Sequence, residues 1–449
     1  MRLVVMQIGL LIIILKEWNN MSDKVNGNVT VLLEKSEVVY DMLTKVGKGD
    51  NEHVEPTIEN FEIILENDYT ITKHIQYNLF SNRPEYIEYD KDGKVDRIRA
   101  WKDSDDSKIM AYIEKTYGLF NDKKFAHALS IVMQRHSYNP VKDLIEDGEW
   151  DGIERIDYFL KDVLKCDQDE KYLTQVSRMI FYGGISRVYD PGCKFDYMPV
   201  LSGEQGIGKS TIIAWLALNN SFYKEVTTIE GKEGIECIEG GWICEFAELM
   251  ALKKTQHQES MKAFITRQVD KYRRPYGRYI SEIPRTCIFI GTTNEPDYLK
   301  DTTGNRRYLP LYMKLQRGEM WARKTEIQNY IAQCWKEALY KYKNGEVYLT
   351  IPSEYYNIVE VEREKAMVED LGLQNVKNYL DSKEVGYRVC SKEILEVVFR
   401  KLNKEMSRAD TSMIAKYMVK FPEWEKKPAT NLGNDYGVQR YWIKVREDD

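Results

Sequence analysis

The chain has 449 residues, of which 43% are hydrophobic and 30% charged, and its formal net charge is -6. This length leaves room for about three domains, and the composition is that of an ordinary globular protein. The acidic balance excludes a protein coated with basic surface. It does not exclude nucleic acid as a partner, because a ring-shaped assembly can confine its basic residues to a central channel.

Seven cysteines are scattered along the sequence without a C-x-x-C pair. An odd and dispersed set favours reduced thiols in the cytoplasm over a disulfide framework or a zinc site. The five histidines also lack metal-ligand spacing, so we expect no structural metal.

The run Leu3–Leu15 is apolar but too short to span a bilayer. No small-residue cleavage site follows it in Lys16–Asn20, and Met21 begins a polar sequence that looks like a natural protein start. We therefore expect residues 1–20 to be an upstream extension or apolar tail, and we expect no membrane partner. A short anchor on a membrane surface is the alternative.

Residues 21–150 are expected to form an N-terminal α+β domain that is mostly helical. Its predicted helices are Ser36–Val46, Ile109–Tyr117 and Phe125–Met133, and a hairpin is predicted from Tyr86–Tyr89 and Val95–Ile98. The dipeptide Asp92-Gly93 between those two runs is typical of a tight hairpin turn. Trp150-Asp151-Gly152 then opens a turn into a helical stretch that runs to about Val188.

A complete phosphate-binding loop pattern, G-x-x-x-x-G-K-[ST], follows the apolar run Met198–Leu201. It comprises Gly203, Glu204, Gln205, Gly206, Ile207, Gly208, Lys209, Ser210 and Thr211. The glycines let backbone N–H groups close around phosphates, Lys209 can reach the β- and γ-phosphates of ATP, and the Ser210 hydroxyl can bind Mg²⁺. An apolar helix, Thr211–Leu218, is expected to follow and to add the positive end of its dipole.

Two further apolar strands, Trp242–Cys244 and Thr286–Ile290, follow the loop along the chain. Unbroken apolar strands separated by helical segments indicate a parallel sheet that is covered on both faces. We therefore expect residues 151–368 to form a doubly wound α/β core of the phosphate-loop ATPase type.

Residues 369–449 have a different character. Two helices are predicted, one over Glu393–Leu402 and one over Met413–Val419, the second preceded by a capping-box variant at Ser407 and Asp410. An aromatic hairpin turns at residues 434–437 and ends the chain. Short helices followed by a terminal hairpin indicate a winged-helix-like domain that binds DNA or protein.

Acidic and amide side chains follow the second and third core strands. Glu245 stands at the end of the second strand and Glu248 shortly after it, and such carboxylates hold Mg²⁺ or polarise the attacking water. We expect Glu245 near the metal and Glu248 nearer the water or the DNA side, although one of the two could be an ordinary surface carboxylate. Asn294, after the third strand, is placed to bind the γ-phosphate or the water, since ligands collect at the carboxyl ends of strands.

Arg306 and Arg307 are adjacent on a Gly-Asn turn. An arginine that reaches across a subunit boundary can stabilise the transferring phosphoryl group, and the spacing after Asn294 suits an oligomeric ATPase. A surface pair that binds a carboxylate is the alternative, and the sequence does not distinguish the two arginines.

Basic and aromatic residues alternate around a Pro–Gly turn between the second and third strands. This pattern suits a hairpin that contacts nucleic-acid backbone and stacks on bases, although charged runs are more often solvated loops. We expect DNA contacts from Lys262, Lys271, Arg273, Arg274, Tyr276 and Arg278, and from Lys416 and Lys420 in the C-terminal domain.

Taken together, these motifs resemble the virulence-associated protein E family of phages and pathogenicity islands. The resemblance covers about residues 139–310. It is carried by Asn139-Pro140-Val141, Trp150-Asp151-Gly152-x-x-Arg155, the phosphate-binding pattern, Glu245-x-x-Glu248, the run Asp270–Arg278, Gly291-Thr292-Thr293-Asn294 and Asp301-x-Thr303-Gly304-Asn305-Arg306-Arg307. The compact spacing between the phosphate-binding pattern and Asn294 also resembles superfamily 3 helicases within the AAA+ class.

The resemblance implies a hexameric, ATP- and Mg²⁺-dependent motor that acts on single-stranded or forked DNA at the replication origin of a mobile element. Some relatives carry a primase domain, but no clear acidic triad precedes the motor in this sequence. A host replication protein is a further expected partner. Two alternatives stay open: an AAA+ ATPase that remodels a protein partner, and a monomeric small-molecule kinase. The basic hairpin and Arg306-Arg307 weigh against the kinase.

Overall fold

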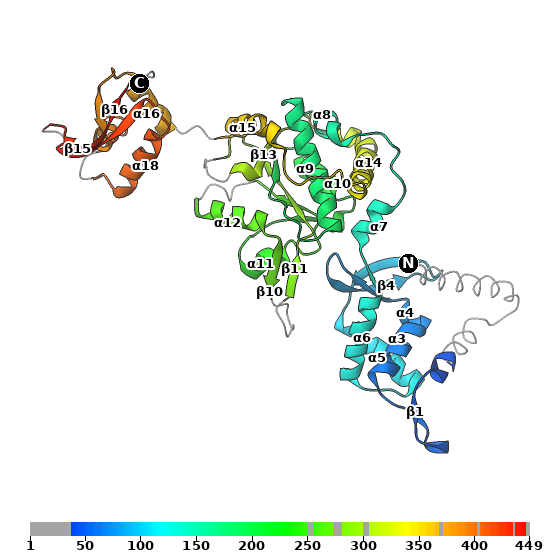
Figure 1. The fold of residues 1–449 in the computed structure, drawn as a ribbon. Helices are drawn as coiled ribbons and strands as arrows, with labels where there is room; N and C mark the ends of the chain where they lie inside the picture. Colours follow the sequence, from blue (N-terminus) through cyan, green and yellow to red (C-terminus); the bar gives the residue numbers. More distant parts are fainter. Residues whose placement is uncertain are drawn as a thin grey trace. The chain divides into compact units, whose positions relative to one another are not determined.

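The computed structural model describes residues 37–248, 255–272, 281–299, 305–367, 371–401, 405–433 and 436–445. The chain forms two compact units, Met1–Asn294 with Arg306–Val359 and Glu295–Asn305 with Glu360–Asp449; Figure 1 colours them along the sequence. The expected extension of residues 1–20 lies outside the described residues. Within the described ranges, no helix is both long enough and apolar enough to cross a membrane.

The N-terminal part of the first unit packs helices against a four-stranded sheet of order β5-β4-β3-β6. Its elements are β1 (Lys45–Val46), β2 (His53–Val54), α3 (Ile58–Asn67), α4 (Tyr69–Thr72), β3 (Ile75–Asn78), β4 (Arg83–Tyr89), β5 (Val95–Ala100), α5 (Asp103–Tyr117), α6 (Asp122–Arg135) and β6 (Ser137–Tyr138). The antiparallel pair β4–β5 confirms the predicted hairpin. Gly93 has a φ of +75° in its turn, a conformation that glycine adopts without strain.

Two helix predictions in this first unit are wrong in extent. The helix expected over Ser36–Val46 covers only residues 37–41 of the described chain, and Val46 lies in β1, where it pairs with His53. The helical stretch expected to run to Val188 is broken: α8 (Phe159–Asp162) ends early, and α9 (Glu170–Tyr189) begins at a new cap, Asp169. The Asp169 carboxylate accepts the first free N–H groups of α9, so it starts a separate helix.

A five-stranded sheet forms the centre of the first unit, and all of its neighbouring strands are parallel. Its spatial order is β13-β7-β12-β9-β8. The strands are β7 (Met198–Ser202), β8 (Tyr223–Glu225), β9 (Ile243–Phe246), β12 (Ile288–Thr293) and β13 (Tyr308–Tyr312). Apart from the edge strand β8, they are buried almost throughout, as the continuous apolar runs predicted. The expectation of a mixed α/β core with a parallel sheet is thereby confirmed.

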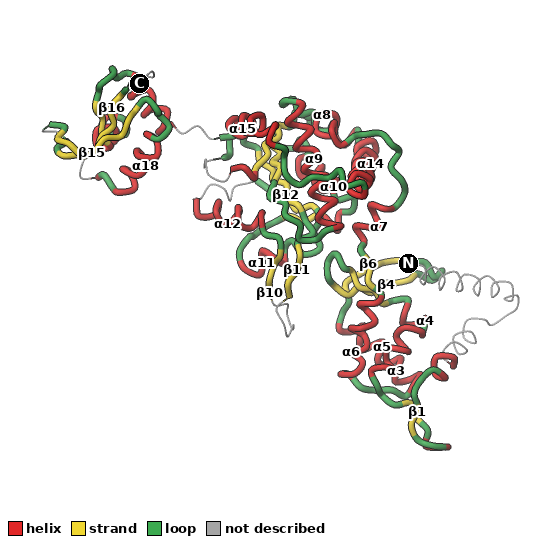
Figure 2. Tube along the Cα trace, in the orientation of Figure 1, coloured by secondary structure: helices red, strands yellow, loops and turns green. Residues whose placement is uncertain are grey.

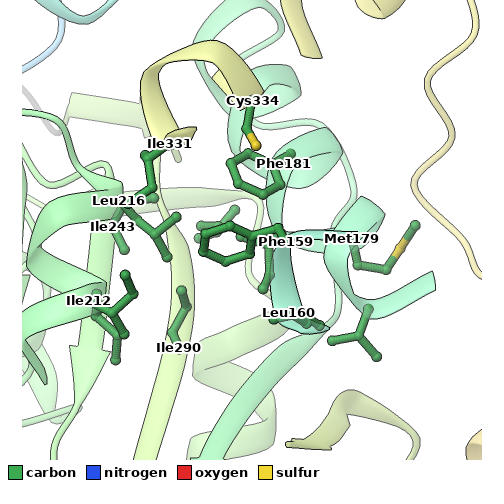
Figure 3. Close-up of a cluster of buried hydrophobic side chains, with 14 of the residues drawn as sticks. Phe159, Leu160, Met179, Phe181, Ile212, Leu216, Ile243, Ile290, Ile331 and Cys334 are labelled. Carbon is green, nitrogen blue, oxygen red and sulfur yellow. The ribbon is translucent and has the colours of Figure 1, made fainter. Parts of the chain in front are cut away.

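Helices surround this sheet, as Figure 2 shows in red and yellow. Besides α8 and α9, they are α7 (Pro140–Glu146), α10 (Lys209–Leu216), α11 (Gly231–Glu236), α12 (Thr255–Thr266), α13 (Glu319–Ala322) and α14 (Lys324–Lys343). Side chains from α8, α9, α10, α14 and the strands form one core; Figure 3 shows Phe159, Phe181 and Ile243 among them. A Cβ on Gly184 would lie 2.4 Å from the Trp335 ring, so glycine lets α9 and α14 pack closely.

An antiparallel hairpin leaves the core between the sheet strands β9 and β12. It consists of β10 (Val269–Tyr272) and β11 (Ser281–Pro284), with Lys271 opposite Glu282. A hairpin at this position is what the basic and aromatic residues around the Pro–Gly turn predicted. Its tip, residues 273–280, lies outside the described residues.

The C-terminal unit contains a three-stranded antiparallel sheet of order β14-β16-β15. In chain order its elements are α16 (Leu371–Asp381), β14 (Arg388–Cys390), α17 (Ser391–Val397), α18 (Arg408–Met418), β15 (Trp424–Asn431) and β16 (Val438–Lys444), and α15 (Tyr356–Lys365) precedes them. The capping box at Ser407 and Asp410 is present at the start of α18. The helix predicted to extend to Leu402 ends earlier, at Val397.

Candidate functional site

The connection between β7 and α10 is a tight loop, residues 203–208, which we call the glycine loop. Gly203, Gly206 and Gly208 have φ values of +151°, +83° and +101°. A Cβ on Gly203 would lie 2.9 Å from the Met313 carbonyl oxygen, and one on Gly208 would lie 2.8 Å from Sδ of Met320. Both backbone conformation and space therefore require glycine here, and α10 begins directly after the loop at Lys209.

The ammonium of Lys209 is held at the centre of this loop. Its Nζ donates to the carbonyl oxygens of Gly203 and Glu204, each at 2.8 Å, and to Oδ1 of Asn294 at 2.9 Å. The side chain is largely buried, and this burial lowers the pKa of the Lys209 ammonium, while the Glu245 and Glu248 carboxylates act in the opposite direction. A buried cation beside a glycine loop is suited to an anionic ligand.

Glu245 lies inside strand β9 and is completely buried. Its Oε1 accepts hydrogen bonds from the hydroxyls of Ser210 at 2.7 Å and Thr292 at 2.8 Å. Its Oε2 accepts from the Tyr223 hydroxyl at 2.5 Å. Three neutral hydroxyls thus surround a buried carboxylate, and a divalent cation would find oxygen ligands of the hard type that Mg²⁺ prefers in Ser210 and Glu245.

The structure therefore brings together four of the residues singled out from the sequence: Lys209, Ser210, Glu245 and Asn294. They come from the carboxyl ends of three adjacent parallel strands, β7, β12 and β9, where ligands of open α/β sheets usually bind. Glu248 lies close by on an exposed turn with a φ of +46°, and its N–H donates to Oγ1 of Thr292 at 3.4 Å.

Arg306 and Arg307 do not join this cluster. They form a short 3-10 helix that leads into β13, whose first residue, Tyr308, pairs with Met198, the first residue of β7. The glycine loop follows the last residue of β7, so the two arginines lie at the opposite, amino edge of the sheet. Arg306 is exposed and Arg307 half-buried.

Apart from Lys262, the residues expected to contact DNA fall into three groups. Lys271 is exposed on the hairpin, where its Nζ lies 2.6 Å from Oε1 of Glu282. Lys416 and Lys420 are exposed on and just after α18. Arg273, Arg274, Tyr276 and Arg278 lie outside the described residues.

The burial of Lys262 corrects the expectation that this residue contacts DNA. Its side chain is only 7% exposed and its Nζ lies 3.2 Å from Oε1 of Glu259 on the same helix, α12. Lys262 lies on the face of α12 that turns its stem into the protein. An ammonium buried in this way does not present its charge to a phosphate backbone.

Two residues of the cluster were missed by the sequence analysis. Thr292 was named only within the motif Gly291-Thr292-Thr293-Asn294, after the predicted strand. It lies inside β12, which extends to Thr293, and its hydroxyl donates to Glu245. Tyr223 lies on the short edge strand β8, which was not predicted. No local pattern marks such a tyrosine, because its role depends on the pairing of β8 with β9.

The motif Trp150-Asp151-Gly152-x-x-Arg155 has a structural role. Arg155 makes two hydrogen bonds of 2.7 Å to the Asp151 carboxylate. Oε2 of Glu337 on α14 accepts the backbone N–H groups of Arg155 at 2.6 Å and Ile156 at 3.0 Å. The motif therefore fixes the turn that enters the core and contributes nothing directly to the cluster around Lys209.

The family model of the virulence-associated protein E-like domain matches residues 145–368. Residues 145–368 therefore form a virulence-associated protein E-like domain. The match covers the entire parallel sheet and the cluster around Lys209, so the resemblance seen in the sequence motifs is confirmed. No curated protein matches this virulence-associated protein E-like chain.

Among solved structures, the chain is similar to the apo C-terminal region of NrS-1, with 12% identity, a TM-score of 0.44, and coverage of 84% of this chain and 97% of that one. An A-form apo structure of the same region gives 13% identity, a TM-score of 0.46, and coverage of 84% and 98%. JCV helicase gives 11% identity, a TM-score of 0.26, and coverage of 61% and 82%. Likenesses of this size do not establish a shared function for the virulence-associated protein E-like domain.

Proposed function

We propose that the chain is an ATP-dependent DNA helicase and replication initiator of a phage or another mobile element, built on a superfamily 3-like AAA+ core. The observation that carries the proposal is the meeting of Lys209, Asn294, Ser210 and Glu245 at the carboxyl edge of the parallel sheet. In phosphoryl transfer these residue types supply the phosphate contact, the γ-phosphate or water contact, and the metal ligands.

The strand order supports an ATPase over a small-molecule kinase. β12, which leads to Asn294, lies between β7, which leads to the glycine loop, and β9, which carries Glu245. Because β12 lies between these two strands, the Asn294 amide that follows it can contact the γ-phosphate, and loss of that contact can alter the sheet. Ser210 and Glu245 would hold a Mg²⁺ ion, which would supply positive charge against the negative charge that develops on the phosphates.

Each chain residue has a distinct task in this proposal. The glycine loop cradles the phosphates with its N–H groups, and Lys209 exchanges its contacts with two loop carbonyls for contacts with phosphate oxygens. Glu245 and Ser210 hold the cation, and Glu248 on its exposed turn orients the attacking water. Asn294 binds the γ-phosphate or that water.

A ring assembly, which we propose to be a hexamer, is supported by the position of Arg306 and Arg307. At the amino edge of the sheet they are remote from the cluster of their own chain, but an exposed arginine there can serve the site of a neighbouring subunit. The β10–β11 hairpin and the C-terminal unit, whose element order is that of a winged helix, would supply the DNA contacts.

The test is ATP hydrolysis with and without forked DNA, followed by strand displacement on the same substrate. We expect DNA to raise turnover, and we expect Lys209→Ala to abolish both hydrolysis and displacement. Hydrolysis that DNA leaves unchanged, together with no displacement, would contradict the helicase proposal and leave protein remodelling as the use of the ATP.

A further inference from the structure

The segment that follows β13 returns over the glycine loop. Met313, Arg317 and Met320 of this segment each lie against one glycine of the loop: Met313 against Gly203, Met320 against Gly208, and Arg317 against Gly206. A Cβ built on Gly206 would be 3.6 Å from Nε of Arg317. The segment thus forms one wall of the loop, and Arg317 places a permanent positive charge in that wall.

Arg317 differs from the other basic residues nearby. Lys314 pairs with Asp167, and Arg323 makes two hydrogen bonds to Glu326 at 3.1 and 2.7 Å. The side chain of Arg317 is exposed, and within the described part of the chain it has no hydrogen bond or ion pair. Its guanidinium, with five N–H donors, is therefore available beside a loop that is built to receive phosphates.

The sheet order shows which part of a nucleotide Arg317 can reach. β12 and β9, with Asn294 and Glu245, lie on one side of β7, and this is the side of the γ-phosphate and the metal in the proposed function. β13 lies on the other side of β7, and Arg317 comes from the segment after β13. Arg317 therefore approaches the loop from the flank opposite the γ-phosphate.

We propose that Arg317 is a nucleotide-binding residue that contacts the α- and β-phosphates of a nucleoside di- or triphosphate bound to its own subunit. The inference rests on the proposed function, because it takes the glycine loop as the phosphate site. It adds a specificity: the contact is made to phosphates that ATP and ADP share. Arg317 therefore strengthens binding of both nucleotides and contributes nothing to the chemical step.

The experiment measures the dissociation constants of a fluorescent ATP analogue and a fluorescent ADP analogue, with steady-state ATP hydrolysis in parallel. A charge-assisted contact to phosphate predicts that Arg317→Ala weakens both nucleotides by about tenfold. KM for ATP should rise by a similar factor while kcat stays within about twofold. Arg317→Lys should lose less, because it keeps the charge but not the bidentate geometry. Lys314→Ala, three residues away on the same segment, is the matched control and should bind as the unaltered protein does.

The outcomes separate this inference from the proposed function. If the unaltered protein binds neither nucleotide, the proposed function itself fails. If it binds and hydrolyses ATP but Arg317→Ala leaves both dissociation constants unchanged, only the role of Arg317 is overturned. An effect confined to ATP, or a loss of kcat at unchanged KM, would also overturn it, because either places Arg317 at the γ-phosphate.

Discussion

Lys209 and Asn294 are 85 residues apart in the sequence, yet Nζ of Lys209 donates a 2.9 Å hydrogen bond to Oδ1 of Asn294. The contact joins the start of α10 to the end of β12. It is possible because β7 and β12 are adjacent and parallel, so that their carboxyl ends meet at one edge. The two residues that we propose to contact the phosphates are thereby held next to each other.

This relationship predicts different defects for the two residues. Asn294→Ala removes the amide that we propose acts on the transferring phosphate or water, so we expect kcat to fall by about 10²–10³ with KM for ATP little changed. Lys209→Ala removes the buried cation and should abolish nucleotide binding. Steady-state hydrolysis and direct nucleotide titration distinguish the two. Equal loss of binding in both variants would contradict this division of roles.

The surroundings of Glu245 predict a graded series. Glu245→Gln keeps the size of the side chain but removes the negative charge, so Mg²⁺-dependent hydrolysis should be lost while the protein stays folded. Tyr223→Phe removes only the hydroxyl that donates to Oε2 at 2.5 Å. We expect this variant to hydrolyse ATP about fivefold more slowly, because the lost hydrogen bond that positions Glu245 contributes about 1 kcal/mol. The measurement is the turnover of ATP as a function of Mg²⁺ concentration. The series would be contradicted if the Tyr223→Phe variant hydrolysed ATP as slowly as the Glu245→Gln variant.

The ion pair between Asp270 and Arg285 at the base of the β10–β11 hairpin predicts that losing either residue lowers the free energy of unfolding by a different amount. Arg285 pairs through two hydrogen bonds, 2.7 and 3.0 Å, with Asp270, and both side chains are buried. Arg187 is also buried close by, where burial lowers the pKa of its guanidinium and the charge of Arg285 adds to this effect. Asp270 is the carboxylate that compensates the buried Arg285 guanidinium, and Arg267 is its more exposed second partner at 3.0 Å.

Asp270→Ala leaves buried guanidinium charge uncompensated, so we expect a loss of about 3–5 kcal/mol in the free energy of unfolding. Arg285→Met should cost less, because Asp270 keeps Arg267 as a partner. Arg267→Ala, at a half-exposed ion pair, is the control and should cost less than about 1 kcal/mol. Thermal and denaturant unfolding give the ranking. A larger loss in the free energy of unfolding for Arg285→Met than for Asp270→Ala would contradict this ranking.

The parts of this site that could be predicted from the sequence are those encoded in contiguous segments. The phosphate-binding pattern occupies eight consecutive residues, 203–210, and Glu245 and Asn294 follow apolar runs that are visible as strands. Tyr223 could not be found in this way, since its contact depends on which strand pairs with the edge of the sheet. Burial of Lys262 likewise depends on the orientation of α12 against the core, which helical spacing alone does not determine.

The motif around Arg155 predicts a defect in folding and not in catalysis. Glu337→Ala would leave the backbone N–H groups of Arg155 and Ile156 without their acceptor, at about 1–3 kcal/mol for each buried donor. We expect a lower midpoint of thermal unfolding, but an unchanged KM for ATP at temperatures where the protein is folded. A changed KM with an unchanged midpoint would instead tie this motif to the nucleotide site.

The position of Arg306 predicts complementation between subunits. Arg306 is exposed at the edge of the sheet opposite the glycine loop, so in a ring it would act on the site of a neighbouring subunit. Lys209→Ala and Arg306→Ala should each be inactive alone, because every interface lacks one of the two groups. In rings assembled from equal amounts of both variants, about a quarter of the interfaces combine an intact Lys209 with an intact Arg306.

We therefore expect the mixture to regain about a quarter of the hydrolysis rate of the unaltered protein, whereas rings assembled from either variant alone stay inactive. Subunit mixing is checked by mass measurement of the assembled oligomer with a nonhydrolysable ATP analogue. Arg307→Ala in the same mixture tests the half-buried neighbour: because its guanidinium is less accessible, its loss should leave the single variant partly active. If the mixed rings form and stay inactive, Arg306 does not act across the interface, and the ring proposal loses the observation that supports it.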